Sequence, residues 1–139
     1  MRRGKKRGMI LQQPWARLVC EGVFPALVRS MATKARGRVA IIAKGMDPDA
    51  LVDGHPPNRN EFPHPALVGY VHISDCIKVP GEQIVAILRR NYGNTFADFY
   101  PRHYLPHRFA VYLWTLSNPR KLRRPRKIHT GKSLVWSRL

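Results

Sequence analysis

The chain has 139 residues, enough for one domain with a hydrophobic core, and its hydrophobic content of 44% argues against intrinsic disorder. It carries 25 Lys and Arg against 8 Asp and Glu, a net charge of +17, and a field of that sign attracts polyanions, chiefly nucleic acid. No stretch approaches the roughly 18 apolar residues of a membrane-spanning helix, so we expect no membrane partner.

The first residues, Met1–Gly8, alternate cations with glycines and cannot pack a core, so the sequence predicts a flexible basic arm there. This arm is either a solvated tail or a nucleic-acid contact. Met9–Gln12 follows as a short first strand. No apolar segment typical of a secretory signal follows the basic residues. We therefore expect a cytoplasmic protein whose cysteines, Cys20 and Cys76, are reduced.

A helix is predicted after the first strand. Pro14 is suited to the first helical position, because its ring presets φ and its missing N–H is not needed there. Trp15, Leu18 and Val19 recur at the spacing of one helix face and are the expected buried residues. Gly22 is the expected end, since glycine adopts the left-handed conformation without a Cβ clash.

A buried strand is predicted at Val39–Ala43, which is apolar and partly β-branched. The residues before it, Arg29–Arg36, form a turn rich in cations. After it, Lys44-Gly45 predicts a turn, and Asp47–Gly54 has the start and stop signals of a helix of little more than one turn. The four prolines of His55–Pro65 predict a loop, because proline removes backbone donors.

The clearest strand is Leu67–Val79, in which apolar and polar residues alternate. Asp75 interrupts its apolar face, so this carboxylate needs a partner or marks a bulge. Glu82–Asn91 then has the pattern of a helix that ends at Gly93.

The last third of the chain predicts two strands and a basic loop. Phe109–Leu116 is apolar on both faces, which indicates a central strand with Trp114 in the core. Asn118-Pro119 predicts a turn. Arg120–Lys127 follows as a loop with six cations in eight residues, and Ser133–Arg138 is a last short strand.

Strands outnumber helices and follow one another near the end of the chain. This pattern favours an α+β fold, a small and partly open β-barrel with flanking helices, over a βαβ fold. The sequence contains no internal repeat and no interdomain linker. We therefore predict one domain over residues 9–139, preceded by the arm of residues 1–8.

Several segments together resemble the ASCH domain, a member of the PUA-like superfamily. The resemblance to the opening of that domain lies in QPWARLVCEG, Arg29 and RGRVAIIAKG. The resemblance to its central strand lies in LVGYVHISDCIKV, and that to its closing strands in WTLSNPRKL and GKSLVW. The resemblance covers roughly Leu11 to Trp136. It implies a PUA-like β-barrel with a helix beside a cleft, and RNA binding or a role in RNA metabolism. Relatives include amidohydrolases that act on acetylated cytidine, and ribonuclease activity is reported in the family.

The sequence departs from the family where the hydrolytic relatives carry their catalytic groups. Those hydrolases use a lysine and a threonine just after the first helix, with a glutamate from a later strand. Family members typically read glycine-x-lysine-threonine-x-glutamate-x-arginine at this place. Here only Gly22 and Arg29 match, while Phe24, Pro25 and Leu27 replace the lysine, the threonine and the glutamate. A phenyl ring cannot act as a base, and proline has no hydroxyl. The amidohydrolase mechanism is therefore not expected at these positions.

The predicted nucleic-acid site consists mainly of groups that match phosphate. Arginine binds phosphate through a bidentate fork, and hydroxyls add neutral donors. Six cations in one short run repel one another, and a bound polyphosphate relieves that repulsion. Trp15 is either a core residue or a stacking platform for an unpaired base. The complete set is Trp15, Arg29, Ser30, Thr33, Lys34, Arg36, Lys44, Arg120, Lys121, Arg123, Arg124, Arg126, Lys127 and Lys132.

We predict an RNA-binding module that holds single-stranded or structured RNA as a monomer, without catalysis and without a cofactor. There are two alternatives. One is a structural component of a ribonucleoprotein, and the other is an RNA- or nucleoside-directed hydrolase with a rearranged site. Asp75 with His72 or Lys78 is the remaining acid–base group, although a structural hydrogen bond explains Asp75 equally. His103 and His107 have the spacing of a metal-binding pair, but neighbouring prolines argue against the helix it needs, so no metal site is predicted.

Overall fold

The structure, a computed structural model, describes residues 7–52, 54–94, 110–128 and 136–138. It is an α+β fold, as the sequence predicts, and its sheet contains both parallel and antiparallel pairs. None of the helices in these ranges is long and apolar enough to cross a membrane. In chain order the elements are β1 (Arg7–Gln13), α1 (Trp15–Cys20), β2 (Ala26–Arg29), β3 (Gly37–Met46), β4 (Ala66–Val79), the 3-10 helix η1 (Gly81–Gln83), α2 (Ile84–Tyr92), β5 (Val111–Lys127) and β6 (Trp136–Arg138).

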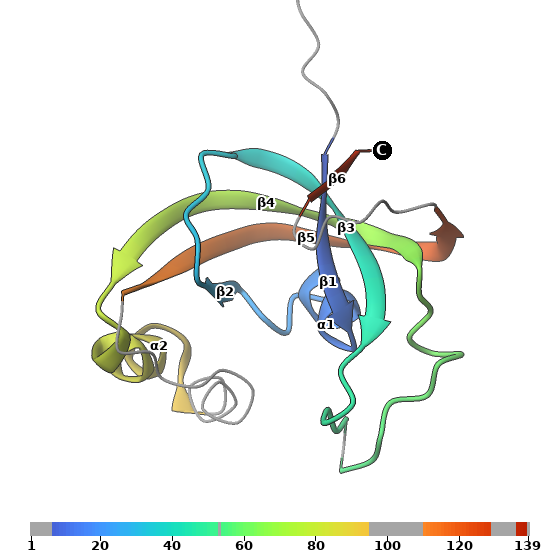
Figure 1. The fold of residues 1–139 in the computed structure, drawn as a ribbon, viewed down its shortest axis with the longest axis horizontal. Helices are drawn as coiled ribbons and strands as arrows, with labels where there is room; N and C mark the ends of the chain where they lie inside the picture. Colours follow the sequence, from blue (N-terminus) through green and yellow to red (C-terminus); the bar gives the residue numbers. More distant parts are fainter. Residues whose placement is uncertain (1–6, 53, 95–109, 129–135, 139) are drawn as a thin grey trace, which may run out of the picture. The chain divides into compact units, whose positions relative to one another are not determined.

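The chain divides into two compact units, and the long strands β4 and β5 pass from one unit to the other. The first unit comprises residues 1–23, 37–72 and 118–139, and its strand order is β5-β4-β3-β1-β6. The second comprises residues 24–36 and 73–117, with the order β2-β5-β4. Figure 1 shows β4 and β5 side by side. The predicted closure of the sheet into a barrel is not established by these pairings and stays a prediction.

In the first unit, β1 pairs in parallel with β3 and antiparallel with β6. The β1–β3 pairing continues from Gly8–Ala40 to Gln13–Met46. The turn predicted at Lys44-Gly45 is therefore wrong, because these residues are part of β3 and the pairing with β1 outweighs the local turn signal. Strand β1 also begins at Arg7, so the last two residues of the predicted arm belong to the sheet. Residues 1–6 lie outside the described part.

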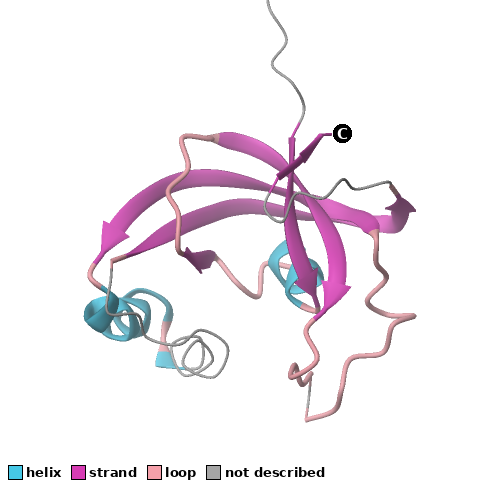
Figure 2. Cartoon of the chain, viewed as in Figure 1, coloured by secondary structure: helices cyan, strands magenta, loops and turns pink. Residues whose placement is uncertain are grey.

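Helix α1 follows β1 directly and lies beside β1 and β3 (Figure 2). Its end is confirmed, since Gly22 has a φ of 81°. Its predicted buried face is corrected: Ala16, Val19 and Cys20 are buried, whereas Trp15 and Leu18 are half-buried. A tryptophan that is partly buried needs a partner for its N–H, and Trp15 has one in the Asp47 carboxylate.

Gln13 and Asp47 hold the corner between β1, α1 and the loop after β3. The Asp47 N–H donates to the Gln13 carbonyl oxygen at 2.8 Å, and the Asp47 carboxylate accepts the Trp15 Nε1–H at 3.1 Å. The same carboxylate accepts the Asp49 N–H at 2.9 Å, which makes an Asx turn. A turn thus replaces the helix predicted at Asp47–Gly54, because the aspartate side chain takes the place of a helical backbone partner.

In the second unit, β2 pairs antiparallel with β5, from Ala26–Thr115 to Arg29–Tyr112. Trp114 is fully buried, as predicted, and its Nε1–H donates to the Met31 carbonyl oxygen at 2.9 Å. Helix α2 buries Ile84 and Leu88 and ends at Gly93, which has a φ of 94°. The predicted helix is therefore confirmed, with a 3-10 turn preceding it.

The largest correction concerns β5. The turn predicted at Asn118-Pro119 and the loop predicted at Arg120–Lys127 are wrong, because the strand runs without a break from Val111 to Lys127. Asn118 has a φ of 47°, a left-handed conformation that asparagine tolerates better than most residues. β5 has β4 as its neighbour in the sheet, and this pairing outweighs the turn preference of the Asn-Pro pair.

The environment of the two thiols predicts their reactivity. Both are free; Cys20 is buried and Cys76 is half-buried. Burial, with the Glu21 charge, raises the pKa of Cys20 to about 12, and the thiolate is the reactive form. We expect a maleimide to label Cys76 in the native protein and both thiols after unfolding, as counted by mass spectrometry. Equally fast labelling of two thiols in the native state contradicts this.

Candidate nucleic-acid interface

The second half of β5, residues Arg120–Lys127, is named here the basic strand segment. All six of its cations are exposed. Because side chains alternate between the two faces of a strand, these charges lie along both sides of one extended backbone. Leu122 anchors the segment, since it packs against a buried cluster that includes Ile10, Ile42 and Leu67. The cations are thus displayed by an ordered strand rather than by a loop.

One cation of this segment is partly neutralised. The Lys121 Nζ lies 3.2 Å from one carboxylate oxygen of Glu21, and the Arg17 Nε lies 3.3 Å from the other. Among the described residues, no ion pair joins the segment's other five cations to an acid. Exposed ion pairs contribute only about 0–1 kcal/mol, so a bound phosphate can compete for Lys121.

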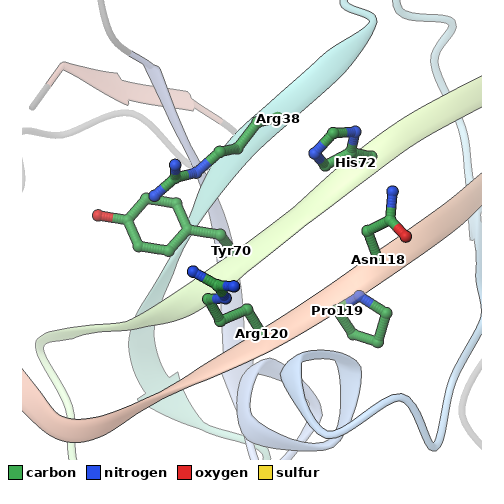
Figure 3. Close-up of a pocket in the computed structure, with 6 residues that line it drawn as sticks. All are labelled: Arg38, Tyr70, His72, Asn118, Pro119 and Arg120. Atoms are coloured by element: carbon green, nitrogen blue, oxygen red, sulfur yellow. The ribbon is translucent and has the colours of Figure 1, made fainter.

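A pocket of about 450 Å³ lies beside the start of this segment, on β3, β4 and β5 (Figure 3). We name it the Arg38–Tyr70 pocket. The guanidinium carbon of Arg38 lies 4.0 Å from the centre of the Tyr70 ring, which is cation–π geometry. None of the described residues that line it carries a carboxylate. The lining residues are Arg38, Tyr70, His72, Asn118, Pro119 and Arg120.

A second pocket, of about 430 Å³, lies beside α1 and is less suited to an anion. Its lining includes the carboxylate of Glu61 as well as three cations, Arg17, Lys121 and Arg123. Arg17 is already engaged: its guanidinium donates to the Glu61 carbonyl oxygen at 2.8 Å and lies 4.9 Å from the centre of the Phe62 ring. Through these two contacts Arg17 attaches α1 to the loop of Glu61 and Phe62, so its guanidinium is already used within the fold.

Solved structures identify the architecture. ASCH from Zymomonas mobilis matches with a TM-score of 0.67 at 13% identity, over 97% of this chain and 87% of that chain. Two point mutants of that protein match at 15% identity, with TM-scores of 0.65 and 0.64, over 98% and 97% of this chain and 91% and 88% of theirs. No family model and no curated protein matches the sequence. The chain has the ASCH fold.

Within the ASCH fold, the three positions that depart from the family motif carry apolar side chains, and Pro25 among them is half-buried. Phe24 and Leu27 are both buried. The Pro25 carbonyl oxygen accepts the Leu116 N–H at 2.8 Å, which ties this segment to β5. Proton transfer needs a titratable group, and none of these three side chains has one.

The residues predicted between Arg29 and Arg36 lie in the second unit. Arg29 is the last residue of β2, not part of a turn, and its guanidinium carbon lies 5.1 Å from the centre of the Trp114 ring. Arg36 donates to the carbonyl oxygens of Thr33 and Ala35, at 3.0 and 2.9 Å. It also lies 3.8 Å from the Asp75 carboxylate. These contacts supply the partner that Asp75 was predicted to need.

The other predicted site residues are divided among several places. Thr33 Oγ1 accepts the Ala35 N–H at 3.0 Å and helps to shape the loop. Ser30 and Lys34 are exposed in the same loop, and Lys44 is half-buried in β3. Trp15 lines neither pocket. Lys132, His103 and His107 lie outside the described residues, within which no group of three or more His, Cys, Asp or Glu could hold a metal.

Sequence reasoning assigned no site role to Arg38, Tyr70, Asn118 or Pro119, and it considered His72 only as an acid–base partner of Asp75. One local signal exists, since Tyr70 and His72 are two residues apart in a strand and therefore share a face. Arg38 precedes the buried run of β3, and Asn118 was assigned to a turn. Nothing in the sequence indicates that these positions meet, because the strand order brings them together.

Proposed function

We propose that this ASCH-fold protein is an RNA-binding module that holds RNA along the basic strand segment without catalysing a reaction. The observation that carries the proposal is the row of exposed cations on β5, five of which have no acidic partner among the described residues. Phosphate contacts by Lys and Arg release counterions, and that release supplies much of the affinity for nucleic acids. The buried apolar side chains of Phe24 and Leu27, with Pro25 between them, support binding rather than hydrolysis.

RNA is favoured over duplex DNA by the shape of the candidate interface. The described helices, α1 and α2, have only 6 and 9 residues. The exposed polar side chains of α2, Arg89–Asn91, are consecutive residues in its last turns rather than a row along one face that could read bases in a major groove. The candidate surface is instead a strand with a polar pocket beside it. Unpaired RNA offers both phosphates and accessible bases to such a surface.

The salt dependence of binding tests the proposal. If about six phosphates are contacted, the affinity for single-stranded RNA should fall with salt at a log–log slope of roughly −4 to −5. We expect joint replacement of Arg123, Arg124 and Arg126 by glutamine to reduce the magnitude of this slope by about 2, since each phosphate contact contributes about 0.7. Fluorescence anisotropy with labelled RNA over a salt series measures the slope.

A charge-matched variant is the control. Arg59, Lys78 and Arg90 are exposed cations outside the basic strand segment, and replacing all three by glutamine removes the same charge. We expect this control to leave the slope nearly unchanged, because none of the three cations belongs to the segment that is proposed to contact phosphates. Equal effects of the two triple variants, or no binding at low salt, would refute the proposal. Hydrolysis of the RNA during the assay would favour an enzyme instead.

A further inference from the structure

We propose that the Arg38–Tyr70 pocket binds one unpaired nucleotide, with its base stacked on Arg38 and its phosphate held by Arg120. This inference rests on the proposed function and gives it a recognition site. The basic strand segment alone would bind any polyanion. A pocket that accepts a single nucleotide would make the protein prefer unpaired RNA over a duplex.

The lining of the pocket selects an anionic, planar ligand. Its described residues contribute two guanidinium groups, one imidazole and one amide, and none of them contributes a carboxylate. In the described part of the chain, neither Arg38 nor Arg120 forms an ion pair. An uncompensated pair of arginines attracts an anion, and the fork of Arg120 matches two phosphate oxygens. His72 and Asn118 provide donors and acceptors for the edge of a base.

The contact between Arg38 and Tyr70 provides a stacking platform. The guanidinium lies over the ring at 4.0 Å, so one of its faces is covered by the tyrosine. Figure 3 shows the two side chains projecting from β3 and β4 into the pocket that Arg120 also lines. Unpaired bases stack on guanidinium planes as they do on aromatic rings. Stacking of Arg38 on Tyr70 holds the platform in place before the ligand arrives, which lowers the entropy cost of binding.

The size of the pocket distinguishes a nucleotide from a simple anion. A volume of about 450 Å³ is much larger than a phosphate group needs, and it falls within the range of roughly 300–1,000 Å³ typical of small-molecule sites. A base in a duplex is stacked between its neighbours and cannot enter such a pocket unless it is flipped out. An unpaired nucleotide of RNA has the size, the charge and the accessibility that this pocket requires.

The position of the pocket beside β5 favours a nucleotide that is part of an RNA chain over a free nucleotide. Arg120 lines the pocket and is also the first residue of the basic strand segment. The cations that follow it on β5 continue away from the pocket in an extended conformation. When one nucleotide of an RNA chain lies in the pocket, the phosphates that flank it can therefore contact the cations of β5.

The test compares two single substitutions of equal charge. Arg38→Gln removes the platform, whereas Arg126→Gln removes one cation of the basic strand segment outside the pocket. We expect Arg38→Gln to weaken binding of a short single-stranded RNA about tenfold more than Arg126→Gln does, as for the loss of one stacked base. The two variants should weaken binding of the matching RNA duplex equally. Equal effects on both RNAs would overturn the inference.

Competition with small ligands identifies the source of the nucleotide. We expect a nucleoside monophosphate to displace the single-stranded RNA from the unsubstituted protein, and inorganic phosphate at the same concentration to fail. Equal competition by the two ligands overturns the inference. A monophosphate that binds more tightly than the single-stranded RNA also overturns it, because the ligand is then a free nucleotide.

Two controls keep the test decisive. Thermal unfolding shows whether Arg38→Gln remains folded, and if it does not, His72→Ala replaces it with the same expected selectivity for single-stranded RNA. Failure of the unsubstituted protein to bind any RNA at low salt refutes the proposed function itself. Binding of RNA without the selective effect refutes only the nucleotide pocket, so the two failures are distinguishable.

Discussion

Replacing Gly69 with alanine is expected to destabilise the protein by about 3 kcal/mol, at the upper end of the cost of overpacking. A Cβ at this position of β4 would clash with the carbonyl oxygen of Arg120 and lie 2.6 Å from the Cys20 Sγ. The Arg120 oxygen belongs to the backbone of β5, so it cannot move aside without shifting the strand. Gly69 thus permits the close approach of β5 and α1 to β4.

Differential scanning calorimetry measures this effect, and we expect the melting temperature to fall by roughly 6–12 °C. Gly54→Ala is the control, because a Cβ there meets no atom within 4 Å and the cost is limited to its φ of 80°. That cost is about 1 kcal/mol. If Gly69→Ala were no more destabilising than Gly54→Ala, the close contact at Arg120 would not exist in solution.

The substitution Gln13→Leu is expected to destabilise the protein by about 2–3 kcal/mol, although leucine has a similar volume. Gln13 is fully buried. Its Nε2 donates to the Pro63 carbonyl oxygen at 3.0 Å, and its Oε1 accepts the Arg17 N–H at 3.1 Å. Leucine would leave both of these backbone groups without a partner, and each unsatisfied group costs about 1–3 kcal/mol.

The neighbouring residue offers a matched control. Gln12 is exposed on the same strand, so Gln12→Leu makes the same chemical change without breaking a buried hydrogen bond. We expect this variant to remain within about 0.5 kcal/mol of the unsubstituted protein, as most surface changes do. Urea unfolding of the two variants gives the difference directly. Similar losses from both would show that the amide of Gln13 contributes nothing specific.

The features predicted correctly depend on local signals. Gly22 and Gly93 end their helices because a left-handed residue follows each last turn, and this preference is a property of glycine itself. The run Val39–Ala43 is buried because a short, apolar and β-branched segment suits an interior strand. The resemblance to the ASCH domain succeeded for a related reason, since it used the order of several such segments.

The features predicted wrongly were decided by non-local pairing. Asn118-Pro119 and Lys44-Gly45 both have the composition of a turn. Each pair nevertheless lies within a strand, β5 and β3 respectively, that pairs with a neighbouring strand of the sheet. Pairing along a neighbouring strand stabilises many residues together, so it outweighs the preference of two residues for a turn. The same effect converted the predicted basic loop into an ordered row of cations.

The sequence by itself determined the class of fold, the buried runs and the excess of positive charge, because composition and short-range spacing decide these properties. It also indicated Arg120–Lys127 as a candidate polyanion site. Only the tertiary structure decided that this site begins at a pocket shared with Arg38 and Tyr70. These residues are far apart in the chain, and the strand order of the sheet, which local propensities do not encode, places them together.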